Sequence, residues 1–149
     1  MTVKQQLHQQ CEAFLNKRLE VIQNTISDIE KALTSETKST AGDKHETGRA
    51  MLQLEREKAG QQLAELQKQF LVLNKINTSQ NHNTIALGSI VYTNQSNYFI
   101  ITSVGEVIYN DDTFFAISLG SPIARLLVGK TINETFIFRN KEITITKII

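Results

Sequence analysis

The chain of 149 residues has little of the chemistry that marks secreted, membrane or zinc-binding proteins. It contains one cysteine, one proline and no tryptophan. One cysteine forms no intrachain disulfide and cannot chelate zinc alone, so Cys11 is expected to pack as a small apolar side chain. No apolar run is long enough to span a membrane, and the N-terminus lacks the apolar core of a signal peptide. We therefore expect no membrane contact and a cytoplasmic location.

The chain also lacks an excess of charge of either sign, because 16 Lys and Arg residues are balanced by 15 Asp and Glu residues. Positions 1–75 hold 21 of these 31 charges, 11 basic and 10 acidic, and the remaining positions hold 5 of each. No basic stripe indicates that the chain binds nucleic acid by itself, so a protein partner is favoured. The change in charge density between the two halves predicts two modules.

The first module has the apolar repeat of a coiled coil. Its first arm places apolar residues at alternating steps of four and three, which is typical of a helix with one partner helix. These residues are Leu15, Leu19, Ile22, Ile26, Ile29 and Leu33. The second arm continues the period with Leu52, Ala59, Leu66 and Leu73 in one heptad column and Leu63 and Phe70 in the other. A short connection between the arms favours an antiparallel hairpin over residues 1–76.

The connection between the arms carries two carboxylates. Residues 41–46 read Ala-Gly-Asp-Lys-His-Glu, and we call this segment the tip. If the second helix begins near Asp43, then Asp43 and Glu46 lie on the same side of its first turn. One interpretation is structural: Asp43 caps the helix and Glu46 completes a capping box. The other is chemical, with both carboxylates presented to a partner at the end of a long hairpin.

The second module reads as a small sheet with one short helix. Residues 77–86 have no periodicity and are predicted to be a linker, followed by a domain over residues 87–149. Short apolar or alternating runs predict antiparallel strands. These runs are 89–93, 97–102, 106–109, 114–118, 135–138 and 142–147. Ser121, Pro122 and Gly129 are placed as N-cap, first helical residue and C-terminal glycine of a short helix that continues from Pro122 through residues 123–128. The predicted fold class is α+β.

Two motifs in this order resemble a known family. A hairpin with Gly42-Asp43-x-x-Glu46 at its tip precedes a β-rich domain with Ile117-Ser-Leu-Gly-Ser-Pro-Ile-Ala-Arg125 and Leu127-Val-Gly-Lys130. This arrangement resembles the bacterial Gre transcript cleavage factors over nearly the whole chain, and the Ser-Pro-Ile-Ala-Arg motif is the more specific part. The resemblance implies an N-terminal coiled coil, a C-terminal domain of FKBP-like fold, and a partner, RNA polymerase, whose secondary channel receives the hairpin.

The resemblance also implies what each residue does. Asp43 and Glu46 would contribute oxygens to a Mg²⁺ shared with the polymerase, beside the 3′ end of the nascent RNA. The chain would hold no cofactor alone and would stimulate cleavage by the polymerase without being an enzyme itself. Contacts with the partner are predicted for Ser121, Pro122, Ile123 and Arg125, with Lys44 and Arg49 near RNA or channel phosphates. We expect a monomer.

The sequence departs from the family after Glu46, where an amide residue and then an aromatic residue usually follow. Here Thr47-Gly48-Arg49-Ala50 follows instead. Three alternatives stay open: a factor of the same fold that occupies the channel and inhibits transcription, a coiled-coil adaptor whose tip acids only cap a helix, and a peptidyl-prolyl isomerase. The isomerase would need an aromatic-lined proline pocket. The aromatic residues lie mostly in predicted strands, where core packing explains them.

Overall fold

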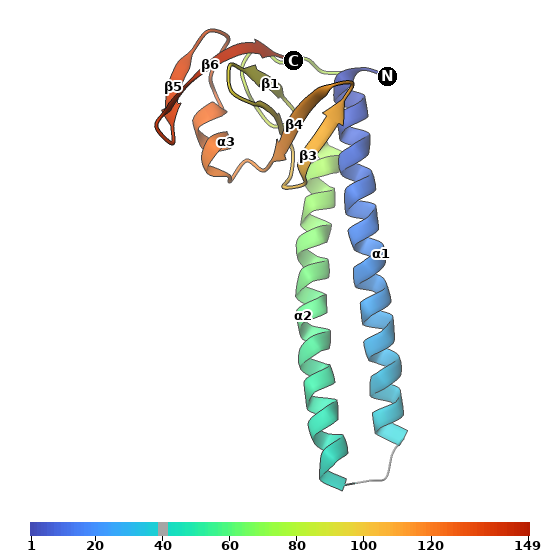
Figure 1. The fold of residues 1–149 in the computed structure, drawn as a ribbon. Coiled ribbons are helices and arrows are strands. Elements are labelled where there is room, and N and C mark those ends of the chain that lie inside the picture. Colours follow the sequence, from blue (N-terminus) through green and yellow to red (C-terminus); the bar gives the residue numbers. More distant parts are fainter. Residues whose placement is uncertain (39–41) are drawn as a thin grey trace. The chain divides into compact units, whose positions relative to one another are not determined.

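The computed structural model describes the backbone of residues 1–38 and 42–149 and the side chains of residues 1–36 and 46–149. Two long helices come first, α1 (Val3–Lys38) and α2 (Gly42–Lys75), and they run antiparallel to each other (Figure 1). The chain divides into two compact units: unit 1 contains Met1–Phe14 and Phe70–Ile149, and unit 2 contains Leu15–Gln69. The predicted α+β fold, a helical hairpin followed by a small sheet with a short helix, is confirmed.

The apolar repeat forms the interface of the two helices in unit 2. We call this apolar interface between α1 and α2 the seam. Leu15, Ile29, Ala59 and Leu66 are buried in it, and the other residues of the predicted repeat in this unit are half-buried. The residues that flank them are mostly exposed, as expected for a helix that has a single partner. Arg56 occupies the heptad column of Leu63, and its Nε lies 3.3 Å from Glu30 Oε1 across the hairpin. A cross-helix ion pair therefore lies at the solvent-exposed edge of the seam.

Unit 1 contains a six-stranded sheet in the order β3-β4-β2-β1-β6-β5. Its elements, in chain order, are β1 (Ile90–Thr93), β2 (Asn97–Ile100), β3 (Gly105–Tyr109), β4 (Asp112–Ile117), α3 (Pro122–Leu127), β5 (Thr135–Phe138) and β6 (Lys141–Ile148). The strands fall where the sequence predicted them, within one or two residues. One pairing differs, because β2 and β4 are parallel and the other strand pairs are antiparallel. The expectation of a purely antiparallel sheet was wrong at this pair.

The two ends of α3 use the residues predicted for them. The Oγ of Ser121 accepts a hydrogen bond from the Ala124 amide at 3.3 Å, and Pro122 follows as the first helical residue. After the helix, Gly129 adopts a φ of +88°, which a residue with a side chain rarely tolerates. The β5–β6 hairpin turns through Arg139 and Asn140, both with positive φ, as in the two-residue turns that match strand twist.

One face of the sheet packs against α3, and we call it the α3 face. Its buried core consists of Ile85, Val91, Ile100, Ile123, Leu127, Ile143 and Ile145. Side chains alternate between faces along each strand, so Phe99 and Phe114 lie on the opposite face, where both are fully buried. Residues 77–86 have no helix or strand, and Ile85 within them is buried and hydrogen-bonded through its backbone to Gly129 and Lys130. The predicted linker thus contributes to the core of unit 1, and the predicted domain boundaries stay a prediction.

The first turns of α1 are hydrogen-bonded to other parts of unit 1. The amide side chain of Gln10 accepts from the Ile108 N–H at 3.1 Å and donates to the Ile108 carbonyl at 2.5 Å. Because β3 is an edge strand, these bonds satisfy backbone groups that no neighbouring strand pairs. Lys4 Nζ donates to the Gln80 carbonyl at 2.7 Å, and His8 Nε2 lies 2.9 Å from the Leu73 carbonyl. No pattern in the sequence predicted the role of Gln10.

Candidate functional site

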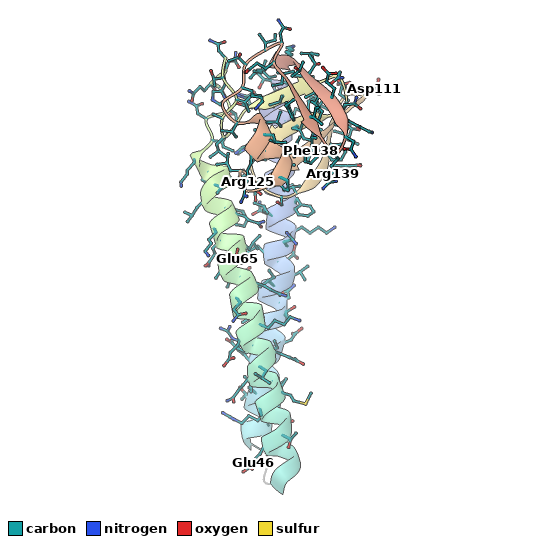
Figure 2. The ribbon with its side chains drawn as sticks, turned by 90° about the vertical axis from the view of Figure 1, so that its left-hand side faces the viewer. Glu46, Glu65, Asp111, Arg125, Phe138 and Arg139 are labelled. Atoms are coloured by element: carbon teal, nitrogen blue, oxygen red, sulfur yellow. The ribbon has the colours of Figure 1, made fainter. Side chains whose placement is uncertain are left out.

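The candidate site is the tip of the hairpin, where α2 begins. The backbone of α2 starts at Gly42, so Asp43 and Glu46 both lie in the first turns of one helix, three residues apart. This spacing places both residues on one side of the helix, as predicted. The side chain of Glu46 is exposed, and Figure 2 shows it near the start of α2. The side chains of Asp43 and Lys44, and with them the predicted capping bonds, lie outside the described residues.

A third carboxylate lies close to the tip, on the other helix. Glu36 follows Leu15, Ile22 and Ile29 in the same heptad column of α1 and is half-buried. A Cβ at Gly48 would lie 3.5 Å from Glu36 Oε1, an ordinary contact distance, so this carboxylate lies against α2 close to the tip. Glu36 was not among the predicted site residues, although its place in the heptad column marks it as a residue that faces α2. Charged residues therefore replace apolar ones where the seam approaches the tip.

Arg49 is a second charged residue that occupies a heptad position near the tip. It lies seven residues before Arg56, which in turn lies seven before Leu63, so all three share a heptad column of α2. Arg49 is half-buried. A half-buried position on the seam restricts the directions in which its guanidinium can point. The contact of Arg49 with phosphates stays a prediction.

The tip residues fit part of a magnesium site. Mg²⁺ prefers oxygen ligands in octahedral geometry and keeps several waters, so two carboxylates alone would leave the site incomplete. Among the residues whose side chains are described, no group of three or more His, Cys, Asp or Glu could hold a metal ion. The donor set of the tip, Asp43 and Glu46, matches the oxygen chemistry of a site that a partner would complete.

The second predicted contact region is the start of α3. Ser121 Oγ donates to the Ser118 carbonyl at 2.9 Å as well as capping the helix, and the Ile123 side chain is only 7% exposed. Both residues therefore stabilise α3 itself. Pro122 and Arg125 are exposed, so their side chains are accessible to a partner. Figure 2 shows Arg125 on the sheet domain.

Among the residues with described side chains, those with shifted pKa values lie in unit 1. Burial raises the pKa of the Cys11 thiol to about 12, and the side chain is fully buried, which confirms its predicted packing role. Burial lowers the pKa of Lys4. Burial and the nearby charge of Lys4 lower the pKa of His82, whose Nδ1 lies 2.6 Å from Ser89 Oγ. Ser89 is fully buried, so this Ser–His pair stabilises the fold and is closed to a substrate.

Comparisons of the chain with models of protein families, with curated proteins and with solved structures find no match. Within the described part of the chain, no helix combines the length and apolar character needed to cross a membrane. The candidate site therefore depends on the geometry of the tip and on the sequence motifs.

Proposed function

We propose that this protein is a transcription elongation factor that binds RNA polymerase through its secondary channel and stimulates cleavage of backtracked RNA. The observation that carries the proposal is the position of Asp43 and Glu46, one helical turn apart at the start of α2, where the chain turns between two paired helices. The resemblance of the Gly42–Glu46 and Ile117–Arg125 segments to the Gre factors supports the same function.

The length of the hairpin suits a protein that reaches into a channel. Helix α1 has 36 residues and α2 has 34, so each is about 50 Å long at 1.5 Å per residue. The predominantly exposed flanks of both helices in unit 2 match a segment surrounded by water. Neither helix carries a long apolar surface outside the seam, so insertion into a polar channel would leave the coiled coil intact.

In this proposal the chain completes an active site that belongs to its partner. Asp43 and Glu46 each offer a carboxylate, and α2 keeps both on one side so that they can bind the same ion. Mg²⁺, when bound, would lower the pKa of a water molecule and stabilise the leaving oxygen. Glu46 would help to orient the attacking water by accepting a hydrogen bond from it, and the exposed position of its side chain permits this contact.

The test uses purified elongation complexes that have been stalled in a backtracked state. The wild-type chain should shorten the 3′ end of the RNA, and the double variant Asp43→Asn, Glu46→Gln should bind the polymerase without shortening it. Asparagine and glutamine keep the size and the helix-capping capacity of the acids but remove their charge. A capping role alone would leave the variant as active as the wild type.

Glu65→Gln is the matched control for the double variant. Glu65 is also an exposed glutamate of α2 (Figure 2). Its Oε1 lies 3.2 Å from Lys68 Nζ in an exposed ion pair. Removal of the Glu65 charge should leave cleavage unchanged. Binding of the wild-type chain to the polymerase without any shortening of the RNA would contradict the proposal and favour the inhibitor, and absence of binding would favour the adaptor.

A further inference from the structure

The α3 face of the sheet carries a row of aromatic side chains that are only half-buried. On adjacent strands, Tyr98 and Phe115 pair in parallel register, and their ring centroids are 6.3 Å apart. Phe136 and Phe138 of β5 also pack against the core of this face. We call Phe115, Tyr98, Phe138 and Phe136 the aromatic row. The row has two parts, one on β4 and β2 and one on β5, with β1 and β6 between them, and each ring retains an accessible part.

Two cations lie over rings of the aromatic row. The guanidinium of Arg139 lies over the Phe138 ring, 5.0 Å from its centroid, and Lys130 Nζ lies 5.3 Å from the centroid of Phe136. Arg139 also acts on Tyr98: burial raises the pKa of the phenol, and a Ser96 hydrogen bond and the Arg139 charge offset part of the rise. Arg139 therefore lies over Phe138 and close enough to Tyr98 for its charge to act on the phenol, and Figure 2 shows it with Phe138 and Arg125 on this domain.

The sheet register places two neighbouring charges of β6 on different faces. Phe138 pairs with Lys141, and Ile137 pairs with Glu142, so the lysine is on the α3 face and the glutamate on the opposite one. Asp112 is also on the opposite face, where its charge contributes to raising the pKa of Tyr92. An acid of the α3 face, Glu106, lies on the edge strand β3, at the far end of the row from β5.

The cations of the α3 face form no ion pair with any residue whose side chain the structure describes. Of the residues with described side chains, Arg125, Lys130, Arg139 and Lys141 make no ion pair. The domain as a whole has equal numbers of acidic and basic residues, so its net charge hides this separation. A surface with unpaired cations and accessible rings complements a ligand that is both anionic and flat.

We propose that the α3 face binds single-stranded nucleic acid, independently of the acids at the hairpin tip. Bases stack on aromatic rings and on guanidinium planes, and the backbone phosphates pair with lysine and arginine. Arg139 lies over the Phe138 ring and is itself exposed, so its guanidinium is accessible to a base, and Lys130, Lys141 and Arg125 are available for phosphates. An acidic peptide would satisfy the cations but would present no planar groups to the rings, and a duplex conceals the faces of its bases.

The test measures binding of the full chain to a labelled oligouridylate of about 12 nucleotides by fluorescence anisotropy at low salt. The substitution Arg139→Lys retains the charge and removes the planar group. It should weaken binding about 5- to 10-fold with an unchanged salt dependence, because one stacking contact is lost. Lys141→Gln should weaken binding and lower the slope against the logarithm of salt concentration by about 0.7, as expected for one phosphate contact with a single strand.

Lys147→Gln is the matched control. Like Lys141, Lys147 is an exposed lysine of β6. Its Nζ lies 5.3 Å from the centroid of Tyr92, which packs on Phe114, so Lys147 belongs to the opposite face of the sheet. The control should bind the oligonucleotide as the wild type does. Equal binding by wild type and Arg139→Lys, equal weakening by Lys147→Gln and Lys141→Gln, or absence of binding at low salt would each overturn the proposal. Equally tight binding of duplex RNA or of a polyglutamate peptide would overturn it as well.

Discussion

The two compact units of this protein are stabilised by different kinds of packing. In unit 2, Leu15, Ile29, Ala59 and Leu66 lie in one seam between two helices, and most of the surrounding side chains are exposed. In unit 1, buried side chains occupy both faces of a sheet, with Phe99 and Phe114 on one and Ile100 and Ile145 on the other. A seam tolerates losses because two helices can move closer together, whereas a sheet core is constrained from several directions.

The tyrosines make this comparison measurable. All three, Tyr92, Tyr98 and Tyr109, lie in strands of unit 1, and the chain has no tryptophan. Near-ultraviolet circular dichroism therefore reports mainly on the packing of the sheet, although phenylalanine contributes weakly. Far-ultraviolet circular dichroism reports mainly on the two long helices. Unfolding in urea, followed by both signals, distinguishes an effect on unit 1 from an effect on unit 2.

The largest expected effect is that of Phe114→Ala. Phe114 is fully buried, and its ring meets Tyr92 edge-on at a centroid distance of 5.4 Å. Its removal should lower the free energy of unfolding by about 3–5 kcal/mol and shift the near-ultraviolet transition to lower urea. Phe115→Ala is the control. Phe115 lies on the α3 face and is half-buried, so its removal should lower the free energy of unfolding by less. Equal losses for the two variants would contradict the assignment of faces.

A smaller effect is expected for Leu66→Ala in the seam of unit 2. Leu66 is 3% exposed, and its loss should destabilise the helices by about 2 kcal/mol, at the low end for a buried leucine because the seam can close. The far-ultraviolet transition should shift while the tyrosine signal stays in place. Leu54→Ala, at a position 66% exposed, should change neither signal. A shared transition for both signals would show that the two units unfold together.

The loss of the α3 cap should have an effect of about 1 kcal/mol. Ser121→Ala removes the oxygen that accepts from the Ala124 amide, and such a change at an N-cap costs roughly that amount. The near-ultraviolet transition should move to slightly lower urea. Ser103→Ala, at an exposed serine outside the helices and strands, serves as the control. An unchanged transition in Ser121→Ala would mean that α3 does not depend on its cap.

The smallest expected effect is a dependence of unit 1 on pH through His82. The pKa of His82 in the folded protein lies below its ordinary value of 6.5, so the folded state binds fewer protons than the unfolded state. The contribution is fully present above pH 6.5 and is lost as the pH falls through the lowered folded pKa. The tyrosine transition should therefore move to lower urea on acidification, and His82→Gln should reduce this movement. An identical pH dependence in the variant would contradict the assignment to His82.

The sequence predicted the helices and most strand positions because these depend on local signals. The heptad spacing from Leu15 to Leu33 specified one partner for α1, and the Ser121-Pro122 pair specified the start of α3. The parallel pairing of β2 with β4 was missed, because it joins segments separated by β3 and no local pattern encodes it. At the tip, the sequence identified Asp43 and Glu46 by their spacing. It overlooked Glu36, whose proximity to Gly48 depends on the pairing of the helices.

The sequence by itself determined which segments are helical, which are extended and where each begins, because the periods of apolar residues and the capping residues act over a few positions. Only the tertiary structure decided which charges share a surface. Lys141 and Glu142 are adjacent in the chain and lie on opposite faces of the sheet, and Arg139 meets Phe138 and Tyr98 through the fold of the β5–β6 hairpin. Strand register places the side chains of Lys141 and Glu142 on their faces, and register is set by contacts between distant residues.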